Sequence, residues 1–292
     1  MSDPAPRRFS LHADPDSVPP VPGERRLGLV RRRRIGPVPL RIILPNLVTL
    51  LALSMGLTGI RFAIEGQFQI AVLVVIIAAV LDGFDGRLAR ALRGTTRFGA
   101  ELDSLADFVD FGVAPGLILY LWNLHQMKSL GWFAALVFAI ACALRLARFN
   151  VSLDDPNRPK WEGHFFTGMP APAGAVVGLL PLYLSYSVIG LPASRTTAPF
   201  EIGYVILIAF LMASRIPHFS VKKINRIPRD YVLAVLFAIA AVALLLATFP
   251  MEVLACLSLG YLATIPFAVL KHRAFAAAQA TGAHPPSAPP PR

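Results

Sequence analysis

Eight apolar segments, each about as long as a bilayer is thick, constrain the fold of this chain more than any other feature. A membrane hydrocarbon core of about 30 Å requires about 20 residues of helix. Inside lipid, a helix satisfies all of its backbone hydrogen bonds within one segment. The segments are 41–64, 68–92, 98–124, 130–150, 169–190, 199–214, 230–248 and 251–270. The sequence therefore predicts an all-α fold, a polytopic membrane helix bundle with about eight transmembrane helices.

Composition agrees with a membrane protein and argues against other classes. Only 15% of the residues are charged, and the mean hydropathy of +0.59 lies above that of soluble domains. The net charge of +11 would suit a nucleic-acid partner, but the basic residues gather at helix ends, so no nucleic acid is expected. Cys142 and Cys256 lie in apolar runs, which predicts core residues and neither a disulfide nor a metal site.

Two flanking segments differ from the apolar part of the chain. Residues 1–35 are rich in Pro, Arg and Ser without apolar periodicity, and we interpret them as a disordered basic cytosolic tail. They contain no apolar core of a signal peptide, so no cleaved leader is expected. Residues 36–273 form the predicted transmembrane domain. Residues 274–292 are rich in Ala and then Pro, which predicts a second cytosolic tail.

The distribution of Lys and Arg predicts the orientation in the membrane. With eight crossings both termini lie on the same side. Most basic residues beside the segments fall on the side of the arginine run at 31–34, and only Arg61, Lys128 and Arg195 fall opposite. Because cytosolic loops carry the excess of Lys and Arg, we expect both termini and the aspartates described next to face the cytosol, in the cell (inner) membrane.

Four aspartates interrupt two of the apolar segments. Asp82 and Asp85 lie near the end of the second segment, and Asp103 and Asp107 lie near the start of the third. A carboxylate at the bilayer centre costs roughly 2.5 to 3.5 kcal/mol, so four of them indicate a functional site. One helical residue turns about 100°, which places each pair on one helix face. If the helices pack antiparallel, the four carboxylates converge on a pocket that suits Mg²⁺, Mn²⁺ or Ca²⁺, and two such ions would clamp a pyrophosphate.

Small residues continue both aspartate faces. Gly86 lies one turn after Asp82, Gly99 lies one turn before Asp103, and Ala89 extends the strip. A ligand can approach the backbone at such positions, although small residues in membrane helices also serve close packing. Arg90 follows, with a planar fork of donors that suits phosphate oxygens.

The spacing of these residues is D-x-x-D-G-x-x-A-R, eight residues, and then G-x-x-x-D-x-x-x-D. It resembles the signature of the CDP-alcohol phosphotransferases. The resemblance implies an integral membrane enzyme, in this family a homodimer, that moves a phosphatidyl or similar group from a CDP-linked donor to an alcohol and releases CMP. It implies Asp107 as the catalytic base. The implied ligands of two Mg²⁺ or Mn²⁺ ions are Asp82, Asp85, Asp103 and Asp107. The implied CDP-binding residues are Asp82, Gly86, Ala89, Arg90 and Gly99.

Polar residues near the start of the first apolar segment are further candidates for the CDP site. Asn46 and Thr49 lie on the expected cytosolic side of that segment. Their side chains would hydrogen-bond either a neighbouring helix or the nucleotide. Both interpretations stay open for each residue.

Three shorter motifs resemble one branch of this family, the phosphatidylserine synthases. They are RLARFN at 145–150, FTGMPAP at 166–172 and SRIPHFSVKK at 214–223. The resemblance implies CDP-diacylglycerol as donor and L-serine as acceptor. A guanidinium pairs bidentately with a carboxylate, so Arg145, Arg148 and Asn150 are candidates for the acceptor or lipid-phosphate site, although the arginines also fit as membrane anchors. Asp110 departs from this branch, in which a neutral serine or asparagine is expected.

The predicted function is therefore transfer of the phosphatidyl group of CDP-diacylglycerol to L-serine. An alternative is the same chemistry with glycerol 3-phosphate, inositol phosphate or choline as the acceptor. A cation transporter is a remote alternative, because intramembrane carboxylates also mark ion pathways. Interrupted helices and repeated halves would favour a transporter, and the sequence shows neither pattern.

Overall fold

A computed structural model describes residues 40–153, 165–214, 216–219 and 231–280. The described elements belong to one compact unit, Pro39–Arg292. The predicted tail at 1–35 lies outside the described residues, and so does the part of the C-terminal tail beyond residue 280. The structure therefore bears on the predicted transmembrane domain.

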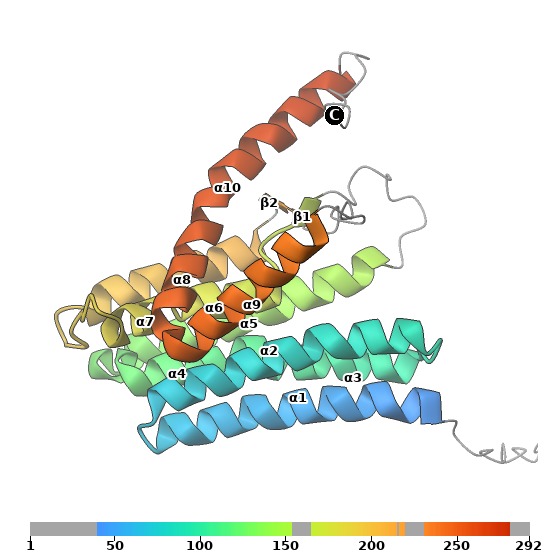
Figure 1. Ribbon diagram of the computed structural model, residues 1–292. Coiled ribbons are helices and arrows are strands. Elements are labelled where there is room, and N and C mark those ends of the chain that lie inside the picture. The colour runs from blue at the N-terminus through green and yellow to red at the C-terminus, as the bar shows by residue number, and fades with distance from the viewer. Residues whose placement is uncertain (1–39, 154–164, 215, 220–230, 281–292) are drawn as a thin grey trace, which may run out of the picture. The chain divides into compact units, whose positions relative to one another are not determined.

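Helices dominate the described part of the chain (Figure 1). The first half contains α1 (Leu40–Ile64), α2 (Phe68–Ala91), α3 (Arg97–Phe108), a π-helical segment (Val109–Val113), α4 (Ala114–Trp122), a 3₁₀ turn (Leu124–Met127) and α5 (Ser129–Leu153). The second half contains β1 (Phe165–Thr167), α6 (Ala171–Gly178), α7 (Leu180–Tyr186), α8 (Ala198–Ala213), β2 (Pro217–Phe219), α9 (Val232–Thr248) and α10 (Pro250–Ala280).

All eight predicted segments are helical in the structure. Five runs are long and apolar enough to cross a membrane: Leu40–Ile64, Phe68–Ala91, Arg97–Trp122, Ser129–Ser152 and Pro250–Ala268. Three apolar helices are shorter: Ala171–Tyr186, Ala198–Ala213 and Val232–Thr248. The prediction of an all-α, polytopic membrane helix bundle is thereby confirmed.

The structure differs from the expected elements in three places. The segment expected at 169–190 is split into α6 and α7, because Pro181 has no N–H to donate and interrupts the helical ladder. Helix α10 continues past residue 274 to Ala280, into the segment interpreted as a tail. Strands β1 and β2 form a short antiparallel pair in which Phe166 lies opposite His218.

The strand pair joins two motifs that are far apart in the sequence. Strand β1 belongs to the FTGMPAP motif and β2 to the SRIPHFSVKK motif. The backbone continues this contact, because the N–H of Gly168 donates to the carbonyl of Ile216 at 2.9 Å. Gly168 has φ of +82°, a conformation that favours glycine, and a Cβ atom there would crowd the carbonyl oxygens of Met212 and Ser214.

Helices α1 and α2 form an antiparallel hairpin, and α1 also packs against α3 and α4 (Figure 1). The turn between α1 and α2 contains Gly66 with φ of +76°. Further along the hairpin, a Cβ atom at Gly59 would lie only 3.0 Å from the Val75 side chain and 3.2 Å from the carbonyl of Ala71. Glycine thus permits the close approach of two membrane helices, which fixes α2 and its aspartates beside α1.

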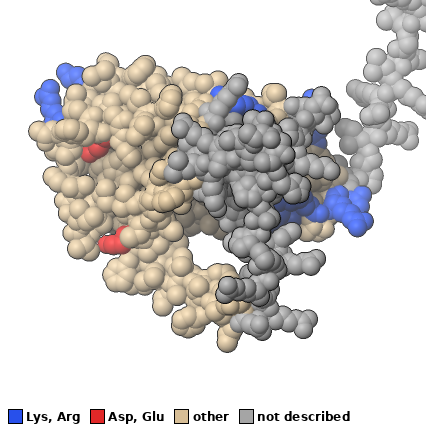
Figure 2. Space-filling model, turned by 90° about the horizontal axis from the view of Figure 1, so that it is seen from above, with Lys and Arg blue, Asp and Glu red and all other residues tan. Residues whose placement is uncertain are grey.

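A buried apolar core lies among α4, α5, α6, α7 and α8, and the π-helical segment and parts of α1, α2 and α10 also contribute to it. Its largest fully buried side chains include Phe111, Phe138, Tyr183 and Ile208. The outer surface is also apolar, as expected for helices that face lipid, and α9 buries none of its described residues. Figure 2 shows the same pattern on one face, where uncharged residues dominate and Lys and Arg lie towards the margins.

Candidate active site

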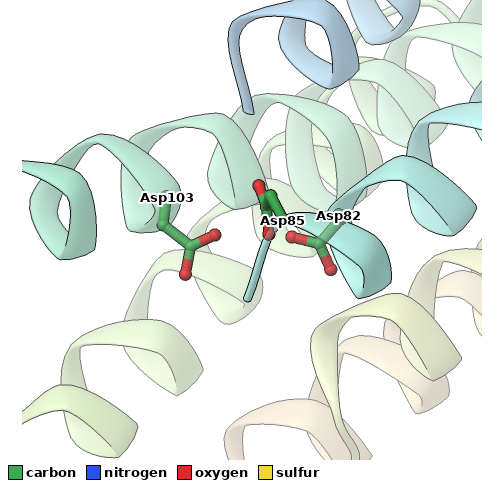
Figure 3. Close-up of side chains that lie close together, drawn as sticks. All are labelled: Asp82, Asp85 and Asp103. Atoms are coloured by element: carbon green, nitrogen blue, oxygen red, sulfur yellow. The ribbon is translucent and has the colours of Figure 1, made fainter. Parts of the chain in front are cut away.

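Three of the predicted aspartates converge at one point, as Figure 3 shows. Asp82 and Asp85 come from the last turns of α2, and Asp103 comes from α3. Each of them offers one carboxylate oxygen, and these oxygens lie within 4.8 Å of one another. Oxygen ligands at this spacing suit a hard divalent cation such as Mg²⁺ or Mn²⁺. The residues present therefore fit the metal site that the sequence pattern predicts.

Local structure explains how α3 presents its carboxylate. The side chain of Thr96 caps α3 by accepting a hydrogen bond from the N–H of Gly99 at 3.0 Å. Asp103 and Asp107 follow one turn apart on the helix, so they share one face. The helix cap thus fixes the start of α3 and the direction in which its aspartates point.

Asp107 lies beside the cluster. Its carboxyl interacts electrostatically with those of Asp82 and Asp103. One of its oxygens, Oδ1, is buried and has no hydrogen-bond partner among the described residues. Because buried polar atoms are nearly always paired, this oxygen indicates a place for a cation or for a substrate proton. Its position fits the role of catalytic base, which stays a prediction.

Thr49 of α1 supports the cluster from outside. Its hydroxyl donates a hydrogen bond of 2.6 Å to Oδ2 of Asp85, and both residues are buried. The same hydroxyl also lies 3.2 Å from the carbonyl of Pro45. This contact orients the carboxylate from α1, as partners of metal-ligating groups commonly do. The prediction that Thr49 binds CDP is not tested, but the described contact is with Asp85.

Replacing Thr49 with valine should weaken cation binding by roughly 10- to 100-fold, the usual cost of losing such a supporting contact. The valine has the same shape but no hydroxyl for Asp85. Titration of the purified variant with Mn²⁺ measures the effect. Thr58→Val is a matched control on the same helix, because among the described residues the Thr58 hydroxyl donates to the carbonyl of Ser54, within α1 itself. Equal affinity in the two variants would contradict the supporting role.

The two signature glycines have different surroundings. At Gly86 a Cβ atom would meet only the guanidinium of Arg90, at 3.8 Å, so the α2 backbone is open to a ligand there. At Gly99 a Cβ atom would lie 2.8 Å from Oδ1 of Asn46, so this glycine makes room for α1. Ala89 is half-buried on α2. Gly86 and Arg90 thus fit a ligand site. Gly99 lies against Asn46 of α1, and the prediction that these two residues bind CDP is not tested.

The candidates for the acceptor site, all on α5, fall into two groups. Arg145 is buried, lies over the ring of Phe149 at 5.2 Å, and interacts electrostatically with Asp107 and Asp82. Arg148 instead donates hydrogen bonds to the carbonyls of Ala213 at 2.7 Å and Ser214 at 3.1 Å, at the end of α8.

Asn150 completes this group of candidates. Its side chain donates to the hydroxyl of Ser104 on α3 at 2.8 Å. Asn150 and Arg148 thus tie α5 to neighbouring helices. Arg145 alone of the three is placed beside the carboxylate cluster by the interactions described.

Sequence reasoning named Thr49 and Arg148 as candidates, but it did not identify their partners on other helices. Arg148 donates a hydrogen bond to the end of α8, and Thr49 donates one to Asp85. Both hydrogen bonds join positions that are far apart in the chain. A polar residue within an apolar segment was the available signal for Thr49, but it did not identify the partner.

The fold and the site define a polytopic membrane protein with an acidic cluster able to hold a divalent cation within its helices. The sequence model of the family described as CDP-alcohol phosphatidyltransferase matches residues 42–213. The chain belongs to this family, as the spacing of the aspartates predicts.

Relatives with the name CDP-diacylglycerol–serine O-phosphatidyltransferase are similar over most of the chain. The protein of Mycobacterium leprae (strain TN) is 43% identical over 239 residues, which cover 80% of this chain and 77% of the relative. That of Mycobacterium tuberculosis (strain H37Rv) is 40% identical and covers 79% of each. That of Helicobacter pylori (strain J99) is 35% identical and covers 67% of this chain and 79% of the relative.

Proposed function

We propose that this protein transfers the phosphatidyl group of CDP-diacylglycerol to the hydroxyl of L-serine and releases CMP. The observation that carries the proposal is the convergence of Asp82, Asp85 and Asp103 in a chain that is 43% identical to a relative with that activity in its name. Phosphoryl transfer depends on positioning and on charge stabilisation more than on covalent chemistry. A cluster of carboxylates that can hold divalent cations near the membrane surface suits this task.

The depth of the cluster suits a lipid donor. Asp82 lies 14 positions after Phe68, the first residue of α2, a rise of about 21 Å along the helix. In a hydrocarbon core of about 30 Å the cluster is therefore closer to the far end of α2 than to its start. A donor can keep its acyl chains in the bilayer while its pyrophosphate reaches this level from the interface.

Different residues of the chain have different roles in the reaction. Asp82, Asp85 and Asp103, with Asp107, would hold the divalent cations, which when bound neutralise the charge of the donor pyrophosphate. Asp107 accepts the proton of the serine hydroxyl through its unpaired oxygen as that hydroxyl attacks the lipid-side phosphorus. A new bond joins the serine oxygen to phosphorus, the bond from phosphorus to the CMP oxygen breaks, and CMP leaves with the electron pair.

Neighbouring residues position the two substrates. The exposed backbone at Gly86 and the guanidinium of Arg90 lie where a CDP phosphate can contact both. Arg145, buried beside Asp107, offers a cation for the carboxylate of the acceptor. Arg148 and Asn150 hold α5 against α8 and α3, which fixes the helix that carries Arg145.

Acceptor choice is tested with purified protein, CDP-diacylglycerol and a panel of labelled alcohols. L-serine should be the best acceptor, and ethanolamine, which lacks the carboxylate, should be poor. Arg145→Ala should raise KM for serine by roughly 30- to 150-fold, the cost of about 2 to 3 kcal/mol for a lost charge-assisted hydrogen bond. Arg61→Ala is a control at an exposed arginine paired with Glu65. Better turnover with glycerol 3-phosphate, inositol phosphate or choline would assign a different acceptor.

The orientation is proposed from the basic residues beside the helices. The acidic cluster and both termini face the cytosol of the inner membrane, so the acceptor comes from the cytosol. A cysteine introduced at Ser194, in the connection before α8, should then react with an impermeant thiol reagent in intact cells. A cysteine at Thr95, between α2 and α3, should be shielded, and the reverse pattern would overturn the orientation. The homodimer implied by the family also stays a prediction, which light scattering of the purified protein measures.

A further inference from the structure

Asp110 is a buried carboxylate that the proposed mechanism does not use. It lies in the π-helical segment Val109–Val113, directly after α3. Single π-helical turns within α-helices occur frequently at functional sites. Asp110 lies seven residues after Asp103 and three residues after Asp107, so it continues the helix face that carries these two aspartates.

The surroundings of Asp110 are closely packed and offer little compensation for a charge. Only 1% of the residue is exposed. A Cβ atom at Gly56 of α1 would overlap Oδ1 of Asp110, so the carboxyl occupies the space that this glycine leaves. The same oxygen has no hydrogen-bond partner among the described residues. A buried unpaired carboxylate destabilises a fold unless a nearby positive charge compensates it.

No described Lys, Arg or His forms an ion pair with Asp110. The ion pair that does occur among the described residues joins Arg61 and Glu65, at an exposed place on α1 and the turn after it. The charged group that acts on Asp110 electrostatically is Asp82, a member of the cluster. Two carboxylates that repel each other in a medium of low dielectric are both stabilised by one cation held between or beside them.

We propose that Asp110 is an additional, non-ligating carboxylate of the cation site, whose buried charge increases the affinity of the aspartate cluster for divalent cations. This inference rests on the proposed cation site. Asp110 makes the cluster more negative without contacting the substrates. It therefore acts through its charge on the bound cations and is not a catalytic residue. It also explains why an aspartate is tolerated where the related branch is expected to have a neutral residue: the bound cations supply the missing positive charge.

The test is cation binding by the purified full chain, measured without substrate by titration with Mn²⁺ and detection of free Mn²⁺ by electron paramagnetic resonance. Asp110→Asn keeps the shape and removes the charge. It should weaken Mn²⁺ binding roughly tenfold, the factor that corresponds to about 1.4 kcal/mol of lost attraction. Glu201→Gln is the matched control, because Glu201 is another buried carboxylate, paired with Asn123 and located on α8. The control should bind Mn²⁺ as the native protein does.

A second measurement separates this role from a structural one. The thermal unfolding midpoint of the cation-free Asp110→Asn protein should equal or exceed that of the native protein, because an unpaired buried charge has been removed. Adding Mn²⁺ should raise the midpoint of the variant less than that of the native protein. If Asp110→Asn does not fold, Asp110→Ser, which is smaller and equally neutral, decides the question by the same titration.

The outcomes distinguish the inference from the proposed function. If the native protein binds no Mn²⁺, the cation site itself is wrong. If the native protein binds Mn²⁺ and the neutral variants bind it equally well, the cation site stands and the role of Asp110 is wrong. A loss of affinity in Glu201→Gln as large as that in Asp110→Asn would also overturn the inference, because the effect would then not depend on proximity to the cluster.

Discussion

Replacing Asp107 with asparagine is expected to lower turnover by roughly 10²- to 10⁴-fold, the usual loss when a general base is removed. Asparagine keeps the size of the side chain but cannot take the proton of the acceptor hydroxyl. Asp82, Asp85 and Asp103 still converge in this variant, so donor and cation binding should largely persist. The measurement is the rate of CMP release at saturating serine, together with the affinity for CDP-diacylglycerol.

A matched control for Asp107→Asn is Glu101→Gln. Glu101 is an exposed carboxylate on the same helix, α3, and no role in the site is assigned to it. It should retain native turnover. Near-native turnover in Asp107→Asn would show that another group, or water, accepts the proton, and the cluster would then act only in binding.

Removal of divalent cations should abolish turnover, the second large effect. The interaction of a cation with a pyrophosphate in a water-poor site is worth several kcal/mol, which corresponds to a loss of at least ~10²-fold. Adding Mg²⁺ or Mn²⁺ after chelation should restore the native protein. Asp82→Ala should not recover at the same cation concentration, because one of the three converging oxygens is missing.

The chelation experiment has a clear contrary outcome. Full activity of the native protein in excess EDTA would exclude a cation from the mechanism and leave the three aspartates without the proposed role. Recovery of Asp82→Ala at the native cation concentration would instead remove Asp82 from the ligand set. The first result concerns whether a cation is required, and the second concerns whether Asp82 binds it.

The membrane fold was predictable because its signals are local. The length of each apolar run sets the length of a helix, and all eight runs are helical in the structure. The convergence of Asp82, Asp85 and Asp103 was also predictable, since helical periodicity places each pair on one face and the short connection brings α3 back beside the first hairpin.

The contacts between helices were not predictable in the same way. Whether a glycine leaves room for a ligand or for a neighbouring helix depends on what lies across from it, and the surroundings of Gly86 and Gly99 differ. Arg148 illustrates the same limit, because its donors reach carbonyls at the end of α8. Spacing along one helix identifies a shared face, but the partner of that face is set by tertiary packing.

For Asp110, the sequence showed an unusual residue but not its surroundings. Its departure from the expected residue was visible in the sequence, but its meaning depends on Gly56 and Asp82, which lie on two other helices. The pairing of β1 with β2 was likewise invisible, since each strand is only three residues long. Such short strands are stable only where the surrounding helices bring them together.

The most direct test of the account follows both products of one reaction. Purified protein with CDP-diacylglycerol, labelled L-serine and Mn²⁺ should release CMP and form labelled lipid in equal amounts, and Asp107→Asn should form neither at a comparable rate. CMP release without labelled lipid would contradict transfer to serine. Labelled lipid formed equally fast by Asp107→Asn would contradict the assignment of the catalytic base.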